Sequence, residues 1–87
     1  MPQICEFYGM KIYLYFDDHD PPHFHVRGPD KTRINIINGE YLDGDQPLPR
    51  IKEKKVLKWL EMNKIDMIKA WNACKEGEVP SKIPPLP

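Results

Sequence analysis

The sequence lacks long hydrophobic runs, closely spaced cysteines and an excess of either charge. No stretch approaches about 18 consecutive apolar residues and the N-terminus has no basic region followed by an apolar run, which argues against a membrane-spanning helix or a secretory signal. The two cysteines, Cys5 and Cys74, have neither zinc-finger nor redox-pair spacing, so we expect buried free thiols. We therefore expect a soluble, cytoplasmic protein without membrane contact.

The net charge of zero argues against a generally basic coat protein for nucleic acids, yet the charges are unevenly distributed. Residues 1–49 contain four basic and eight acidic side chains, whereas residues 50–75 contain eight basic and three acidic ones. The basic half is either a solvated helix face or a surface for an acidic partner or a phosphate backbone. At this length we expect a single domain, 1–87, whose small core favours homo-oligomerisation or a partner.

Alternating apolar and polar residues predict several short strands in the first half of the chain. The clearest is 11–16, in which Ile12, Leu14 and Phe16 share one face. Asn38-Gly39 predicts a type I′ hairpin turn, which needs positive φ at both central positions, and Gly9-Met10 is compatible with another tight hairpin. The other expected strands are 4–8, 23–28, 32–37 and a short edge strand at 40–42.

After residue 49 the apolar period changes to that of a helix, which predicts a helical segment over 49–76. It is either one helix or two helices kinked at 63–66, with Asp66 capping the second. Gly77 is the expected C-cap, and the proline-rich tail 78–87 is expected to be extended, either packed across the core or free. The predicted apolar stripe consists of Ile51, Val56, Leu57, Leu60, Met67, Ile68, Trp71 and Cys74; Trp59 is also expected in the core.

These elements predict an α+β domain. An antiparallel meander sheet of four to five strands in 1–45 carries the C-terminal helix, or kinked helix pair, on one face. The covered face is expected to bear Ile12, Leu14, Phe16, Phe24, Val26, Ile34 and Ile36. The opposite face then carries Tyr13, Tyr15, His23, His25, Arg27, Arg33 and Asn35.

The segment 17–26, Asp-Asp-His-Asp-Pro-Pro-His-Phe-His-Val, contains all three histidines and three carboxylates. In an extended chain His23 and His25 point to the same side of the sheet, so both imidazoles can reach one metal ion. The preceding loop offers further ligands, namely His19, Asp17, Asp18 and Asp20. We expect no resident cofactor; the alternative is a divalent transition metal held by His19, His23 and His25.

The same face suits metal-free acid and base chemistry on a phosphodiester. His23 and His25 would exchange protons with the substrate while Arg27 or Arg33 stabilises the charge that develops on phosphorus. The face also suits single-stranded RNA, whose bases stack on aromatic rings; the expected binding residues are Tyr13, Tyr15, Asp18 and His19. A purely structural alternative is a rigid, self-hydrogen-bonded loop beside histidines that lie on a solvated or partner-covered face.

A set of residues spread over the chain carries a family resemblance. It comprises the block Asp-His-x-Pro-Pro-His-Phe-His-Val at 18–26 together with Phe7-Tyr8-Gly9, Ile12, Tyr15-Phe16, Trp59, Trp71 and Ile83-Pro84-Pro85-Leu86. In these residues the whole chain resembles a widespread prokaryotic family of stand-alone proteins catalogued as a domain of unknown function. The resemblance implies a component of a small two-gene module similar to toxin–antitoxin pairs, and it carries over no catalytic residues.

The expected function is that of one member of such a pair. It would contact a small protein partner and act on RNA through the face with His23 and His25. The alternatives are a non-catalytic interaction or regulatory module and a histidine-based metal-binding protein. The residues leave open whether the protein is an enzyme.

Overall fold

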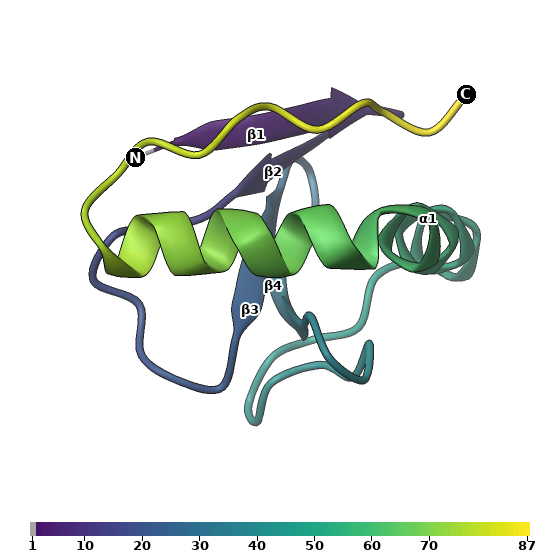
Figure 1. The fold of residues 1–87 in the computed structure, drawn as a ribbon. Coiled ribbons are helices and arrows are strands. Elements are labelled where there is room, and N and C mark those ends of the chain that lie inside the picture. Colours follow the sequence, from purple (N-terminus) through teal and green to yellow (C-terminus); the bar gives the residue numbers. More distant parts are fainter. Residues whose placement is uncertain (1) are drawn as a thin grey trace.

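Four strands and one kinked helix make up the fold in the computed structural model, which describes residues 2–87. The elements are β1 (Gln3–Phe7), β2 (Met10–Tyr13), β3 (His23–Arg27), β4 (Thr32–Asn35) and α1 (Arg50–Lys75). Strands that follow one another in the chain pair antiparallel in the order β1-β2-β3-β4, and the helix follows the sheet (Figure 1). The predicted α+β meander with a C-terminal helix is confirmed.

The first hairpin joins β1 to β2 through a two-residue turn at Tyr8 and Gly9. Their φ angles are 49° and 74°, the positive values that a type I′ turn requires. The turn therefore lies one residue earlier than the predicted Gly9-Met10 position. Tyr8 adopts a left-handed conformation that is uncommon outside glycine, and the matching twist of the two strands favours it here.

The loop after β4 differs from the predicted type I′ turn. Only Gly39 of the Asn38-Gly39 pair has positive φ, and four residues separate Asn35 from Glu40, whose carbonyl accepts the Asn35 amide at 2.8 Å. The Asn35 side chain explains the longer loop, because its Oδ1 accepts the amides of Ile37 and Asn38. The expected edge strand at 40–42 is reduced to a single bridge between Ile34 and Tyr41.

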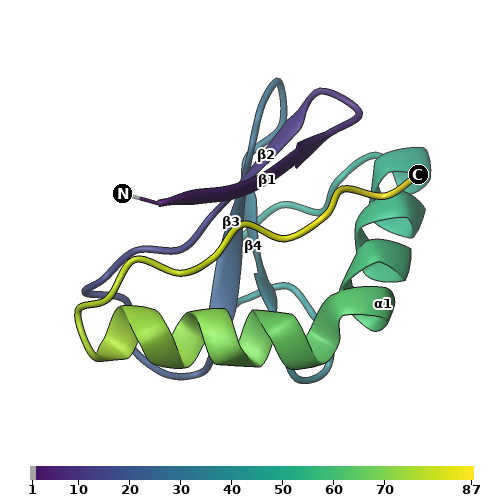
Figure 2. The same cartoon turned by 45° about the horizontal axis from the view of Figure 1, so that its top comes forward.

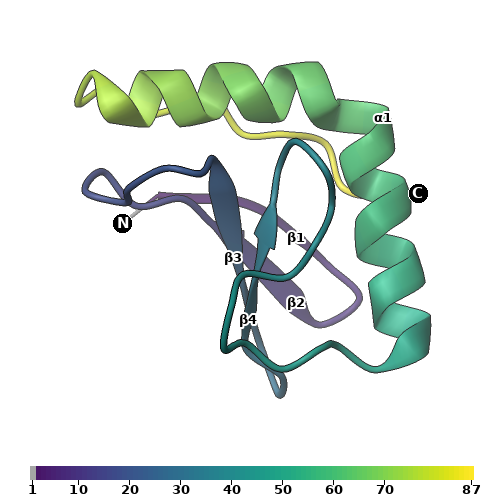
Figure 3. The same cartoon turned by 90° about the horizontal axis from the view of Figure 1, so that it is seen from below.

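The helix α1 is kinked at Asn63, which has the non-helical angles φ −125° and ψ 20°. The Asn63 side chain donates a hydrogen bond to the carbonyl of Trp59 at 2.9 Å. The kinked alternative is therefore confirmed, but the break is at Asn63 and Asp66 lies within the second half. Figure 3 shows that the first half runs beside the sheet, whereas the second half crosses the end at which β3 begins.

Apolar side chains of the sheet and the helix form one core around Trp59. The Trp59 ring is fully buried and its centroid lies 5.4 Å from that of Phe7 and 5.8 Å from that of Phe24. Trp71 is also buried, so both tryptophans belong to the core as predicted. Other core residues are Ile12, Leu14, Val26, Ile34, Ile36, Val56, Leu60 and Met67.

Two residues predicted for the apolar faces are exposed instead. Phe16 is 41% exposed because β2 ends at Tyr13 and the chain then turns, with the Asp18 amide bonded to the Tyr15 carbonyl. Ile51 is 72% exposed because it lies in the first turn of α1, ahead of the first buried helix residue, Val56. In both cases the predicted pattern extends beyond the part of the element that contacts the core.

The proline-rich tail packs alongside β1 (Figures 1 and 2). The helix ends at Lys75, and Gly77 with φ 78° lets the chain reverse. The Ile83 amide then donates to the Ile4 carbonyl, and the indole of Trp59 donates to the Pro84 carbonyl, each at 2.9 Å. Of the two predicted alternatives, packing across the core is the one observed.

The structure of residues 2–87 also bears on the cysteines and on membrane-spanning helices. Cys5 and Cys74 are free and buried, as expected. No helix in this range combines the length and hydrophobicity that crossing a bilayer requires.

Candidate functional site

The strand register places the expected polar residues in rows on one side of the sheet. Tyr13 on β2 lies opposite His25 on β3, which in turn lies opposite Arg33 on β4. His23 lies opposite Asn35 in the neighbouring row. Residues directly opposite one another in a sheet share a face, so these polar side chains lie on the same side of the sheet.

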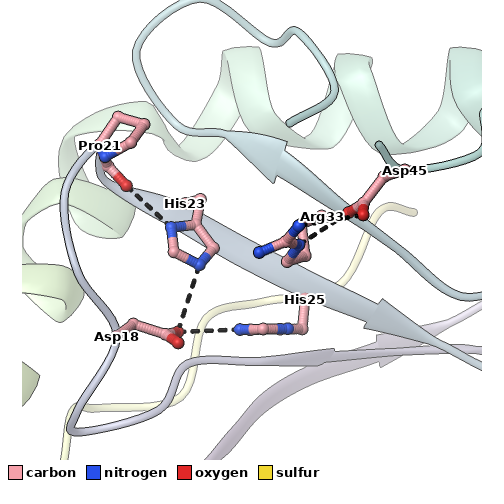
Figure 4. A network of polar contacts seen from close by, with 6 residues as sticks. All are labelled: Asp18, Pro21, His23, His25, Arg33 and Asp45. Atoms are coloured by element: carbon pink, nitrogen blue, oxygen red, sulfur yellow. Dashed lines mark hydrogen bonds and ion pairs between the residues drawn. The ribbon is translucent and has the colours of Figure 1, made fainter. Parts of the chain in front are cut away.

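The carboxylate of Asp18 connects the two strand histidines (Figure 4). Its Oδ2 atom lies 2.9 Å from Nε2 of His25 and 3.5 Å from Nε2 of His23. Asp18 comes from the loop between β2 and β3, and it is itself largely shielded, with a side chain 16% exposed. One loop residue and two strand residues thus meet at one oxygen atom.

His23 shares the side of β3 that bears His25, as predicted, but it is buried, which corrects the expectation that the helix leaves this whole face uncovered. It is 4% exposed, and its ring centroid lies 5.4 Å from that of Trp71 in α1. The cause is the kink in α1, because the second half of the helix crosses the start of β3 and covers this end of the sheet (Figure 3). Phe24 and Val26 are fully buried on the core side, as predicted.

The hydrogen bond at Nδ1 of His23 determines which of its ring nitrogens carries a proton. Nδ1 lies 2.8 Å from the carbonyl oxygen of Pro21, which can only accept, so Nδ1 must donate. In the neutral ring Nε2 is then an unprotonated acceptor. It has no hydrogen-bond partner among the described residues, and the atom facing it is a carboxylate oxygen of Asp18.

His25 is more accessible, with a side chain 16% exposed. The Tyr15 ring meets it edge to face at a centroid distance of 4.3 Å. Burial lowers the pKa of His25 below its ordinary value, although the hydrogen bond to Asp18 opposes this effect. His25 is therefore predominantly neutral at pH 7, and its Nε2 donates to Asp18.

Two cavities of opposite charge border this cluster. Asp18 and His23 line one of about 540 Å³, together with four further carboxylates: Asp17, Asp20, Glu40 and Asp43. His25 lines the other, of about 340 Å³, whose charged residues are Arg27, Lys31, Arg33 and one carboxylate, Asp45. The histidine pair therefore separates a surface that favours cations from one that favours anions.

Arg33, one of the predicted catalytic residues, forms an ion pair with Asp45. Its Nε and Nη2 atoms donate to the two carboxylate oxygens at 2.8 Å and 3.1 Å. This bidentate contact lowers the pKa of Asp45 and raises that of Arg33. Asp45 was missed by sequence reasoning, because no local pattern indicates that a loop residue twelve positions away will fold back onto β4.

Aromatic rings and a guanidinium lie next to His25. The rings of Tyr13 and Tyr15 are parallel within 4° at a centroid distance of 6.2 Å. The guanidinium of Arg27 lies 5.7 Å from the centre of the Tyr15 ring. These three predicted residues are thus brought together on the open face.

Of the predicted metal ligands, His23 and His25 converge with Asp18, whereas His19 does not join them. His19 is exposed in the loop. It lines the acidic cavity together with Asp17 and Asp20. Asp18 is therefore the loop residue that completes the cluster, one of the alternatives that the sequence had left open.

The fold and this cluster define a small α+β domain with a histidine and carboxylate site at one end of its sheet. Residues 9–72 match the model of the family described as domain of unknown function (DUF4160), and the chain belongs to this family. Membership of a family with no assigned function is thereby confirmed. No curated protein and no solved structure matches the chain.

Proposed function

We propose that this protein is one member of a small prokaryotic two-protein module similar to toxin–antitoxin pairs, and that it binds RNA in the cytoplasm. The sequence resemblance supports membership of such a module. The polar face of the sheet supports RNA binding. The binding surface comprises Tyr13, Tyr15, His25, Arg27 and Arg33.

The observation that carries RNA binding is the combination of stacked rings and a basic cavity. Tyr13 and Tyr15 offer parallel rings, with the Arg27 guanidinium over Tyr15. Unpaired bases stack on such rings and on arginine, with each stacked base contributing about 1–3 kcal/mol. The adjoining cavity, with Arg27 and Lys31, supplies positive charge for the phosphate of the same nucleotide, while Arg33 in the same lining is paired with Asp45.

Cleavage of the bound RNA by His23, His25, Arg27 and Arg33 would be a separate step after binding. The Nε2 atoms of both histidines point at the same oxygen of Asp18, whereas acid and base catalysts must face the substrate. We therefore propose that this face binds RNA, and cleavage is tested separately.

A protein partner is the second candidate, supported by a groove of about 410 Å³ on α1. Tyr8 and Met62 line it and are 49% and 58% exposed. Three lysines surround them: Lys54, Lys55 and Lys58. The ammonium of Lys55 lies 3.9 Å from the centre of the Tyr8 ring. Exposed apolar side chains ringed by one sign of charge suit an acidic partner segment.

The RNA proposal is tested with fluorescently labelled single-stranded RNA. Tyr15→Ala and Arg27→Ala should weaken binding about tenfold or more, because each removes a stacking surface or a charge. Lys58→Ala, a change in the α1 groove, is the matched control and should have a smaller effect. Equal losses in all three variants would show non-specific electrostatic binding and refute the sheet-face assignment.

Catalysis is tested by expressing the chain alone in a bacterial host and measuring growth and bulk RNA integrity. Slow growth with fragmented RNA, relieved by His25→Ala in a protein that stays folded, would add cleavage to the proposal. Intact RNA and normal growth with soluble protein would leave binding alone.

A further inference from the structure

The convergence of Asp18, His23 and His25 has the dimensions of a metal site. Their ligand atoms lie within 4.8 Å of one another, and Asp18 Oδ2 is 3.5 Å and 2.9 Å from the two imidazole nitrogens (Figure 4). Ligands held at about 2.0–2.2 Å from one ion are about 3–3.5 Å apart. The three side chains therefore need only small movements to share an ion, and the proton that His25 now donates from Nε2 to Asp18 moves to Nδ1 so that Nε2 can bind.

The unpartnered Nε2 of His23 points independently to a missing ligand. The residue is 4% exposed, and Nε2 has no hydrogen-bond partner among residues 2–87. Because Nδ1 donates to Pro21, Nε2 of the neutral ring directs a lone pair at a carboxylate oxygen, which is also an acceptor. With the ring neutral, a buried acceptor faces a partly buried one, which is unfavourable, and a cation between them removes this repulsion.

The surroundings of His23 are those of a metal-binding histidine. Such residues commonly donate their second ring nitrogen to a backbone carbonyl or a carboxylate, which fixes the tautomer and the ring orientation. Here the Pro21 carbonyl takes this role, and Trp71 packs against the ring. The His25 ring packs against the Tyr15 ring in a T-shaped contact, with the centroids 4.3 Å apart.

The electrostatic environment also favours a cation. The cavity beside Asp18 and His23 is lined by five carboxylates in all, and Arg33 is its one basic side chain whose charge is permanent. Arg33 is already paired with Asp45. A divalent ion would therefore enter a region of negative potential.

We propose that Asp18, His23 and His25 bind one divalent transition-metal ion through one carboxylate oxygen and two imidazole nitrogens. This donor set suits Zn(II) and Fe(II), and three protein ligands leave coordination positions for water or another molecule on the side of the acidic cavity. The inference goes beyond RNA binding and does not depend on it.

The test uses protein purified without an affinity tag and stripped with a chelator. It is titrated with Co(II), followed by visible absorption, and with Zn(II), followed by calorimetry. We expect one equivalent of either ion to bind and Zn(II) to displace Co(II). Asp18→Asn and His25→Ala should weaken binding more than about a hundredfold, since loss of a ligand exceeds the effect of losing a residue that only supports one.

His19→Ala is the matched control, because it removes an exposed histidine of the same loop and should leave the affinity unchanged. Circular dichroism establishes that each variant is folded, and His25→Gln repeats the ligand change with a bulkier side chain. Failure of the wild-type protein to bind one equivalent would overturn the inference. So would undiminished binding by folded His25→Ala and His25→Gln, or an equal loss in His19→Ala.

Discussion

Trp71 of α1 packs against His23 of β3, with their ring centroids 5.4 Å apart. This contact joins the second half of the kinked helix to the candidate site. His23 is held between the indole and the Pro21 carbonyl, so the helix buries the imidazole while the loop before β3 fixes its direction. The position of the His23 ring thus depends on how the helix and the loop pack against β3, and not on the strand alone.

Replacing Trp71 should reduce both stability and metal binding. Trp71→Ala removes a buried aromatic side chain, which typically costs about 3–5 kcal/mol. Trp71→Phe keeps an aromatic contact, so a smaller loss of stability and near-normal Zn(II) affinity are expected. Denaturant unfolding and calorimetry measure the two effects. Full Zn(II) affinity in a folded Trp71→Ala protein would show that the indole does not position His23.

Removing Asp45 should strengthen RNA binding. Asp45→Asn releases the Arg33 guanidinium from its bidentate partner and removes a negative charge beside the basic cavity. Because the Arg33 side chain is 40% exposed, the stability cost should stay below about 1 kcal/mol. Asp43→Asn removes the same charge from the same loop and serves as the control. If both variants bind RNA equally well, release of Arg33 is not the cause.

Tyr41 should make stability decrease in strongly alkaline solution. Its hydroxyl donates to Glu53 at 2.6 Å and accepts the Leu48 amide at 3.0 Å, and burial followed by the Glu53 contact raises its pKa to about 12. The neutral phenol is favoured in the folded state. Its contribution is therefore complete below pH 10, the ordinary pKa, and is lost as the pH rises toward 12.

The matched variant is Tyr41→Phe, which should cost about 1–2 kcal/mol at neutral pH. The difference in unfolding free energy between the wild type and this variant should shrink between pH 10 and 12. A constant difference across that range would contradict the assigned role of the hydroxyl.

The tail should contribute to stability through Ile83. This side chain is 6% exposed, and its amide bonds to Ile4 of β1. Ile83→Ala should cost about 2–4 kcal/mol, as expected for a buried aliphatic side chain. Val79→Ala is the control because Val79 is 78% exposed, and it should be nearly neutral. Equal, small effects in thermal unfolding would mean that the tail is only loosely attached.

Local patterns in the sequence predicted the presence of the strands and the helix better than the residues at which they begin and end. The alternation in 23–27 identified β3 and its two faces, because side-chain direction in a strand follows from position alone. The alternation in 11–16 misplaced Phe16, since it does not show that β2 ends at Tyr13 and that the chain turns at residues 16–17. The Asn38-Gly39 motif failed because the Asn35 side chain stabilises a longer loop.

The candidate site was also predictable only in part. The histidine spacing placed His23 and His25 on one side of β3, but the choice between Asp18 and His19 depended on how the loop returns to the strand. The burial of His23 depends on the kink at Asn63, which brings Trp71 over the ring. Both are consequences of tertiary packing, which a single sequence does not reveal.

The most direct measurement of the central claim is the ring-nitrogen NMR spectrum of the histidines at pH 8, before and after one equivalent of Zn(II). The geometry at Pro21 predicts that His23 carries its proton on Nδ1 and has a free Nε2. On addition of Zn(II), the Nε2 signals of His23 and His25 should shift together while those of His19 stay in place. A His23 proton on Nε2, or a shift confined to His19, would contradict the account.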